Sequence, residues 1–377
     1  MMDVIVAGWV RTPFCRAHKG ALAGVRPDTM VAECIKEVVR RLELDPAEVD
    51  DVIVGCAYPE GEQGYNIGRM ASLLAGLPDT VPGMTINRLC GSSMQAVISA
   101  TNAIRVGQGD CYIVAGVESM SRVKRRGFNW CPHPVLESGV TEAYVSMGTT
   151  AENVARIYGI SREEQEAFAL MSHIKAAEWE SVNPNIIGID IGDGGTLDRD
   201  GCIRPSTTLE TMARLPLAFD EGGTVTAATS SPLTDGAVAM VVCSQEFATR
   251  LTTDGTTMIL GGCVVGVHPN VMGLGPINAG RKLADLTGIE IDEVDVFEVN
   301  EAFASQSIAT IRDLELDLGK VNIHGGAISI GHPLGASGAR IIGQSQHILE
   351  TKGKELAMAL MCIGGGMGIG VALQRKN

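Results

Sequence analysis

Residues 87–95 read NRLCGSSMQ, and residues 331–338 read GHPLGASG. Each stretch passes from a turn into a predicted helix, and the two helices open at Gly91 and Gly335, 244 positions apart. After Gly91, apolar side chains recur at helical spacing for about four turns. Two similar helix starts in one chain suggest that the chain is built from two related halves.

Two further repeats support this interpretation. The tripeptide EVD at 48–50 recurs at 293–295, an offset of 293 − 48 = 245 positions. Asp110, which precedes a predicted strand, recurs as Glu355 at the same offset. Matches in one order and at one spacing predict a tandem duplication of a single structural unit.

Helices and strands alternate along the first half of the chain. The expected elements are a strand at the N-terminus, a helix at 28–42, strands at 51–56 and 81–87, a helix at 92–106 and a strand at 111–116. This alternation predicts an α/β fold with layers of helices on a mixed or parallel sheet.

Residues 356–373 form an 18-residue stretch without a charged side chain, which is long enough to suggest a membrane span. The stretch contains five glycines, however, and each glycine disfavours a helix by about 1 kcal/mol. Two apolar strands, 356–363 and 369–373, joined by a glycine turn, fit the pattern better. We therefore predict a buried hairpin and no membrane span.

The last strands of the two halves break the common offset. Residues 366–374 match residues 236–244, only 130 positions earlier, so the first half contains 245 − 130 = 115 additional residues. We predict an N-terminal half, 1–255, that is interrupted by an inserted loop domain at about 118–230, and a C-terminal half, 256–377.

The inserted segment has a composition of its own. It contains the basic run RVKRR at 122–126 and a helix from about 161 to 180, which Ser161 and Glu164 begin with a capping box. An excursion of this kind from a two-half core is expected to cover a binding site.

Composition excludes several classes of function. The 377 residues are 45% hydrophobic and carry a formal net charge of −14, which favours a folded, acidic protein over a disordered chain or a nucleic-acid binder. Only 4% are aromatic, too few for base-stacking platforms. The ten cysteines contain no close pair of the kind that binds zinc, and no basic segment precedes the first apolar run. We expect a cytoplasmic protein without a metal site.

Cys90 lies between a predicted strand and a predicted helix. The N-terminus of a helix carries a partial positive charge and free N–H groups, which lower a thiol pKa and stabilise an oxyanion. The position is therefore compatible with a nucleophile, although most cysteines in apolar stretches are only small buried hydrophobes.

Three other segments contain candidate functional residues. His332 is flanked by five glycines between 322 and 338, which indicates a loop that approaches a ligand closely. The duplication would bring its helix and that of Cys90 to the centre of the molecule, where the two side chains could form a nucleophile–base pair. Cys362 enters the glycine turn of the hairpin, and Asn300 with Glu301 follows a strand. Each motif alone is weak, and a single histidine is usually structural.

Together, these segments resemble the thiolase family over nearly the whole chain. The matching blocks are RTPF at 11–14, the segment around Cys90, MGTTAE at 147–152, NEAF at 300–303, GHPLGASG at 331–338 and CIGGGMG at 362–368. The resemblance implies duplicated α-β-α-β-α layered halves related by a pseudo-two-fold axis, with an inserted loop domain. It also implies an acyltransferase that cleaves 3-ketoacyl-CoA with CoA, or condenses two acetyl-CoA molecules, by a ping-pong mechanism.

The resemblance assigns roles to individual residues. Cys90 would take the acyl group as a thioester, His332 would accept its proton, and Cys362 would move the proton at the α-carbon of the second acyl-CoA. Asn300 would hold a water in one oxyanion hole, and the N–H groups of Cys90 and Gly364 would form the other.

Contacts with coenzyme A are implied for three further residues. Ser231 would contact the pantetheine, Met147 would line its tunnel, and Arg214 would replace a phosphate contact that the family usually makes with another arginine, with Arg122 as the alternative. CoA thioesters would be substrates rather than tightly bound cofactors. The family resemblance further implies a homodimer or homotetramer.

Three rival interpretations remain. A ketosynthase-like condensing enzyme has a similar fold but usually lacks a second cysteine equivalent to Cys362. A cysteine hydrolase would also use a cysteine–histidine pair but would not need CoA. A non-catalytic acyl-CoA- or lipid-binding protein on the same fold would be expected to lose Cys90, His332 or Cys362. The sequence does not decide the acyl chain length or the physiological direction of the reaction.

Overall fold

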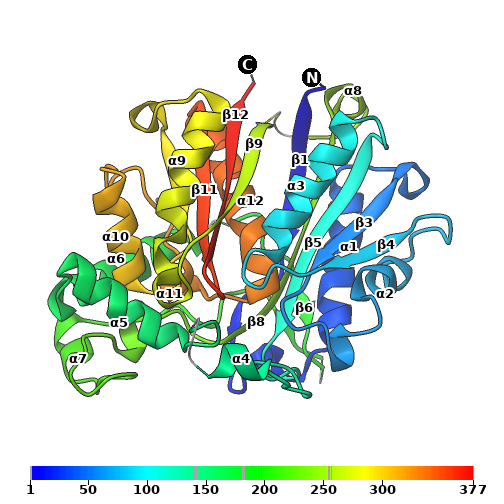
Figure 1. The fold of residues 1–377 in the computed structure, drawn as a ribbon. Coiled ribbons are helices and arrows are strands. Elements are labelled where there is room, and N and C mark those ends of the chain that lie inside the picture. The colour runs from blue at the N-terminus through cyan, green and yellow to red at the C-terminus, as the bar shows by residue number, and fades with distance from the viewer. Residues whose placement is uncertain are drawn as a thin grey trace.

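The computed structural model describes residues 2–138, 142–180, 183–192, 194–253, 255 and 257–376 (Figure 1). Its main sheet has ten strands in the order β10-β11-β12-β9-β1-β8-β5-β3-β4, with β2 paired to β8. These strands are β1 (Val4–Arg11), β2 (Cys15–Arg16), β3 (Asp51–Gly55), β4 (Gly83–Ile86), β5 (Cys111–Ser119), β8 (Thr234–Ser244), β9 (Thr257–Gly266), β10 (Val296–Val299), β11 (Leu356–Ile363) and β12 (Met367–Arg375).

The strand order is symmetric about the contact between β1 and β9. On one side β1 is followed by β8, β5 and β3, and on the other β9 is followed by β12, β11 and β10. The strand directions also match. In each half the strand next to the centre, β8 or β12, is antiparallel to both of its neighbours. The next two strands of each half, β5 with β3 and β11 with β10, are parallel to each other. The chain is therefore a structural duplication, and β4 is an additional edge strand of the first half.

The repeated EVD tripeptide has the same structural task in both halves. The Asp50 carboxylate accepts hydrogen bonds from the N–H groups of Asp110 and Cys111, at 2.7 and 2.9 Å, where β5 begins. The Asp295 carboxylate accepts from Glu355 and Leu356, at 2.9 and 3.2 Å, where β11 begins. Each aspartate thus fixes the start of the strand that the offset had paired with it.

Helices form three layers around the two halves of the sheet. The inner helices are α3 (Ser92–Arg105) and α12 (Leu334–Lys352), and the outer ones are α1 (Pro27–Arg41) and α2 (Ile67–Leu74) on the first half and α9 (Gly275–Thr287) and α10 (Ala304–Asp313) on the second. Side chains of β8 alternate between the core under α1 and the core under α3 and α12. Both faces of this strand are therefore buried, which explains its almost wholly apolar sequence.

The two inner helices pack at very short range. The N–H of Ala339 donates to Ser93 Oγ at 2.9 Å, and a Cβ placed on Gly338 would lie 2.5 Å from the backbone nitrogen of Met94. Glycine is required here because the backbone of α3 occupies the space that a side chain would need.

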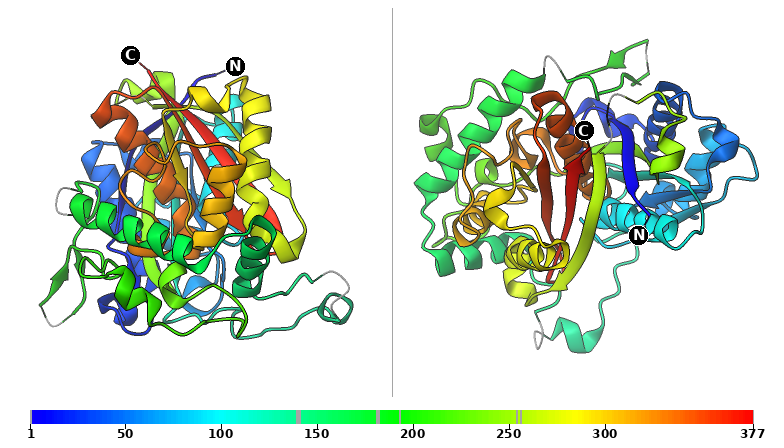
Figure 2. Two further views of the ribbon diagram at one scale, coloured as in Figure 1. Left: turned by 90° about the vertical axis from the view of Figure 1, so that its left-hand side faces the viewer. Right: turned by 90° about the horizontal axis from the view of Figure 1, so that it is seen from above.

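The segment between β5 and β8 leaves the N-terminal half, and its helices α5 and α6 pack against the C-terminal half, whereas Ile187 and Ile189 return to the core of the N-terminal half. It contains α4 (Pro134–Glu137), α5 (Met147–Tyr158), α6 (Arg162–Glu180), α7 (Leu209–Ala213) and the small hairpin β6 (Ile189–Asp190) with β7 (Thr196–Leu197). Helices α5 and α6 lie along α10 and α11 (Ala327–Ile330), as Figure 2 shows. The capping box of α6 is confirmed: Ser161 and Glu164 exchange hydrogen bonds of 2.9 and 3.2 Å.

The predicted C-terminal hairpin is confirmed, because β11 and β12 pair antiparallel around a glycine turn. Among the described residues, no helix has the length and apolarity needed to cross a membrane. Within the same part of the chain, no group of three or more His, Cys, Asp or Glu is arranged to hold a metal ion. Residue 256, with which the expected second half begins, lies outside the described residues.

Candidate active site

Cys90 lies in a tight turn between β4 and α3. Leu89, the residue before it, has a φ of +46°, in the left-handed region that side chains rarely adopt. Asn87 stabilises this backbone, because its Oδ1 accepts the Leu89 N–H at 2.8 Å. Ser92 adds a second restraint by donating to the Leu89 carbonyl at 2.6 Å. The turn therefore holds the cysteine in a defined position.

The Cys90 thiol faces the C-terminal hairpin. The N–H group of Gly364 is hydrogen-bonded to it, and Cys362 is close enough for the two thiolates to repel each other. Burial raises the pKa of the Cys90 thiol, although the N–H of Gly364 acts in the opposite direction. The expectation of a lowered pKa is therefore wrong: the cost of burying the thiolate exceeds the stabilisation from the helix start.

His332 is held by three contacts. The backbone N–H of His332 donates to Thr234 Oγ1 at 3.0 Å. In the ring, Nδ1 lies 2.6 Å from Ser337 Oγ, and Nε2 lies 3.4 Å from Asn300 Nδ2. Ser337 Oγ donates its only hydrogen to the Pro333 carbonyl at 2.9 Å, so it accepts from Nδ1–H. Burial lowers the pKa of His332 to about 3. The ring is therefore neutral at pH 7, with its lone pair on Nε2.

One polar atom of Asn300 has no hydrogen-bond partner among the residues that the structure describes. The backbone N–H of Asn300 donates to the Leu360 carbonyl at 2.9 Å, and its Nδ2 faces His332, but its buried Oδ1 contacts no donor in that part of the chain. A buried acceptor of this kind is costly unless a water or substrate group occupies it. Asn300 is thus suited to hold a water or a polar group of a ligand.

Glu301, next in sequence, has a different role. It is buried and accepts hydrogen bonds from Ser172 Oγ at 2.7 Å and Asn322 Nδ2 at 2.8 Å. A Cβ on Gly326 would lie 2.2 Å from its carboxyl carbon. Glu301 therefore connects α6 of the inserted segment to the glycine-rich loop that precedes His332.

Cys362 lies at the end of β11 in a small apolar cluster with Ala151, Val225, Met272, Ala302 and Phe303, against which Met147 packs. Burial raises the pKa of the Cys362 thiol well above its ordinary value, and the neighbouring Cys90 adds to the shift. The thiol is therefore protonated at neutral pH.

The glycines after Cys362 form an open turn. Gly365 and Gly366 have φ values of +78° and +84°, and a Cβ on Gly366 would lie 2.3 Å from the Val267 carbonyl oxygen. A Cβ on Gly364 would meet nothing closer than Leu89 at 3.4 Å and the Met147 sulfur at 3.6 Å. The Gly364 N–H is thus presented beside a space that Leu89 and Met147 border.

The structure brings the sequence-predicted residues together in two groups: Cys90, Gly364 and Cys362 in one, and His332 with Asn300 in the other. The two groups are connected through β11, because the Asn300 N–H donates to the carbonyl of Leu360, two residues before Cys362. Met147 borders the first group. Ser231 is half-buried, and its N–H donates to the Ala302 carbonyl at 3.0 Å, close to Phe303 of the same apolar cluster.

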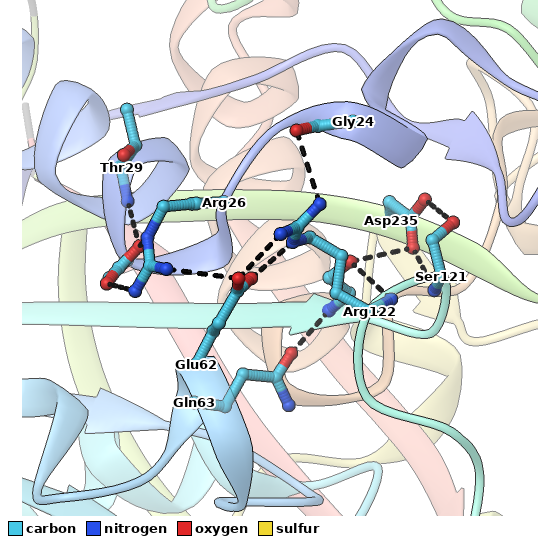
Figure 3. Close-up of polar contacts among 10 residues, drawn as sticks. Gly24, Arg26, Thr29, Glu62, Gln63, Ser121, Arg122 and Asp235 are labelled. Carbon is cyan, nitrogen blue, oxygen red and sulfur yellow. Dashed lines mark hydrogen bonds and ion pairs between the residues drawn. The ribbon is translucent and has the colours of Figure 1, made fainter.

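Arg214 and Arg122 lie apart from this group. Arg214 is 74% exposed and pairs with Glu210 on its own helix. Arg122 forms an ion pair with Glu62, which also binds Arg26 (Figure 3). Neither guanidinium is directed at the cysteines.

Sequence analysis missed two residues that support the site. Ser337, which selects the His332 tautomer, was noted only as part of a helix start. Thr234, which fixes the His332 backbone, begins β8 in a sequence dominated by apolar side chains. A polar side chain at the end of an otherwise apolar strand was the available signal.

Comparisons with known proteins agree with this geometry. The family model described as "Thiolase, N-terminal domain" matches residues 4–246, and that described as "Thiolase, C-terminal domain" matches residues 255–375. The chain belongs to the thiolase family. A 3-ketoacyl-CoA thiolase of Bacillus subtilis is 41% identical over 98% of both chains, and one of Shewanella frigidimarina is 44% identical over 100% of both.

A solved structure shows the same fold. Human mitochondrial 3-ketoacyl-CoA thiolase superposes with a TM-score of 0.91 at 34% identity, covering 100% of this chain and 99% of that one. The likeness includes the two halves and the segment between β5 and β8, so the thiolase architecture extends over the whole chain.

The raised pKa of Cys90 leads to a prediction about its reactivity. In the free protein, alkylation of Cys90 by iodoacetamide should increase with pH and reach half its maximal rate above about pH 8.5, the ordinary thiol value. Peptide mass spectrometry over a pH series measures this, with Cys362 expected to stay unmodified because it is buried. A midpoint below pH 8 at Cys90 would contradict the burial argument.

Proposed function

We propose that the protein catalyses thiolytic cleavage of a 3-ketoacyl-CoA to acetyl-CoA and a shortened acyl-CoA, and the reverse condensation. The observation that supports this proposal is the proximity of two cysteines, Cys90 and Cys362, and the Gly364 N–H, with the His332–Asn300 pair beside the strand that ends at Cys362. A hydrolase or a non-catalytic binding protein has no use for the second thiol, and the relatives described above are named 3-ketoacyl-CoA thiolases.

In the first half-reaction, the Cys90 sulfur attacks the 3-keto carbon. Because burial keeps the Cys90 thiol protonated, its proton moves to Nε2 of the neutral His332 as the carbon–sulfur bond forms. The developing oxyanion accepts hydrogen bonds from backbone N–H groups, including that of Gly364. The bond between the 2- and 3-carbons then breaks and leaves the acyl group on Cys90.

The carbanion of the departing acetyl-CoA needs a proton. Cys362 supplies it, and the raised pKa of this thiol keeps the proton available until that step. In the second half-reaction, the Cys362 thiolate takes the proton of incoming CoA, whose sulfur attacks the Cys90 thioester. Cys90 leaves and regains its proton from His332, which restores the starting state.

We propose further that residues 1–255 and 256–377 are the two domains and that 118–230 is an inserted loop domain that covers the acyl-CoA. The symmetric strand order about β1 and β9 supports this division. Ser231 and Met147, which border the apolar cluster around Cys362, would contact the pantetheine, whereas the Arg214 guanidinium would need to leave Glu210 to reach a phosphate. Free thiols at all ten cysteines support a reducing compartment, the cytoplasm.

The two cysteines have separable tasks in this mechanism. In Cys362→Ser, acyl transfer from acetyl-CoA to Cys90 should fall much less than thiolysis, because CoA can leave as a stable thiolate without a proton. Thiolysis of acetoacetyl-CoA should fall about 10³-fold, since the acetyl-CoA carbanion needs a proton and the serine hydroxyl has a much higher pKa. Intact mass after an acid quench detects the adduct, and Cys90→Ala is the control that should lack it. Equal loss of both activities in Cys362→Ser would assign Cys362 to the fold instead.

The Ser337 contact predicts a selective loss of turnover. Without it, the neutral His332 ring can carry its proton on Nε2, so Ser337→Ala should lower kcat about tenfold or more and leave KM within twofold. Ser345→Ala is a matched control, because Ser345 also donates to the carbonyl four residues earlier on α12, at 2.9 Å, without contacting a histidine. A similar kcat for the two variants would refute the tautomer assignment.

We also propose a homodimer through the N-terminal half. The edge strand β4 carries the side chain of Met84, which is 38% exposed, and it packs beside α2, whose Leu74 is 50% exposed and which Tyr65, 90% exposed, precedes. Leu74→Asp should therefore shift light-scattering mass toward a monomer at micromolar concentration, whereas Leu318→Asp, at a 61% exposed site of the C-terminal half, should not. A monomeric parent protein would exclude the dimer.

A further inference from the structure

Glu118 is a buried carboxylate that the mechanism above does not use. It lies near the end of β5, after a run of mostly apolar residues, and it has no exposed surface. Buried carboxylates usually pair with a cation. The partners of Glu118 within the described chain are instead neutral donors.

Five groups donate hydrogen bonds to this carboxylate. They are the backbone N–H groups of Ala57 at 2.9 Å, Tyr58 at 3.3 Å and Gly335 at 3.0 Å, Gln63 Nε2 at 2.7 Å, and the Cys56 thiol at 3.9 Å. Burial raises the pKa of Glu118 to about 7, while the N–H donors act in the opposite direction. The carboxylate thus joins two segments of the first half to one residue of the second half.

The hydrogen bond with Ala57 connects Glu118, through Asn87, to the turn that contains Cys90. The Ala57 carbonyl accepts a hydrogen bond from Asn87 Nδ2 at 3.0 Å, and Asn87 Oδ1 accepts the Leu89 N–H at 2.8 Å. Leu89 is the strained residue before Cys90. A displacement of the 56–58 segment is therefore transmitted through one side chain to the turn that holds Cys90.

The hydrogen bond with Gly335 connects Glu118 to the start of α12, which positions His332. Gly335 lies in the first turn of α12, whose free N–H groups attract a negative charge. The same turn contains Pro333 and Ser337, which set the position and tautomer of the His332 ring. The Glu118 carboxylate therefore fixes the helix start on which the histidine depends.

Glu118 is itself held in place. Gln63 Oε1 accepts the Ser119 N–H at 2.6 Å, so Gln63 binds both the strand and the carboxylate. The neighbouring Glu62 is bound by Arg26 and Arg122, as Figure 3 shows together with the contact of Gln63. The short helix η3 (Gly61–Gln63) is thus anchored from both sides.

We propose that Glu118 is a positioning residue for acyl transfer: one carboxylate fixes the Cys90 turn of the first half against the His332 helix of the second. The expected effect on turnover rests on the proposed function. The placement of Glu118 between the two helix starts does not depend on that function. Only an acceptor at both oxygens satisfies the donors, so a glutamine would place an N–H₂ group against N–H groups.

The test compares Glu118→Gln with Asp50→Asn. Asp50 is a matched control because its carboxylate also binds two backbone N–H groups, at the opposite end of β5. In Glu118→Gln, kcat for acetoacetyl-CoA thiolysis should fall at least tenfold with KM within twofold. Asp50→Asn should keep both constants within twofold of the parent values.

A second readout does not depend on turnover. The titratable side chains near Glu118 are those of Cys56, Tyr58 and Cys90, and Arg125 lies near Cys90. The Glu118 charge raises the pKa of the Cys90 thiol. Its removal should therefore shift the pH midpoint of Cys90 alkylation downward in Glu118→Gln but not in Asp50→Asn.

The outcomes separate the two hypotheses. An inactive parent protein would refute the proposed function, and the alkylation midpoint would still test the placement of Glu118. An unchanged midpoint, a kcat within twofold of the parent value, or a KM that changes as much as kcat would overturn the positioning role. If Glu118→Gln does not fold, Gln63→Met removes one donor to the carboxylate, and its kcat should decrease in the same selective way.

Discussion

The close packing of α3 against α12 is the constraint on which the rest of the structure depends. Glycines make it possible: a Cβ on Gly338 would lie 2.5 Å from the backbone nitrogen of Met94, and one on Gly116 of β5 would lie 2.3 Å from the Gly335 carbonyl oxygen and 2.7 Å from Ser93 Cβ. Because these backbones touch, the starts of the two helices meet between the halves. Cys90 and His332 come from those helix starts, so the packing of the core also determines the geometry of the chemistry.

Burial at this junction determines the protonation states. It keeps His332 neutral and both thiols protonated, with the pKa of His332 lowered and those of Cys90 and Cys362 raised. These three side chains are therefore uncharged before substrate binds, and their protons move only as bonds to the substrate form or break. The hydrogen bond that His332 Nδ1–H donates to Ser337 Oγ orients the ring, and the Asn300 Oδ1 acceptor can orient a water or ligand group, both at little electrostatic cost.

Much of this arrangement could be predicted from the sequence. The offset between 48–50 and 293–295 indicated the duplication, and in the structure Asp50 and Asp295 bind the first N–H groups of equivalent strands. The glycine spacing indicated the hairpin that contains Cys362. The pKa of Cys90 could not be predicted, because helix position was visible in the sequence but burial was not. Glu118 was missed for a related reason: its partners at 57, 63 and 335 come together only in the fold.

The route of the chain between β5 and β8 affects how the protein is made. Strand β8 pairs with both β1 and β5, yet it is synthesised more than a hundred residues after β5 ends. Until residues 234–244 leave the ribosome, β1 and β5 have no partner between them and expose apolar edges. Pairings of such high sequence separation fold slowly. The nascent first half is consequently the stage at which aggregation competes most directly with folding, and at which a chaperone would contribute most.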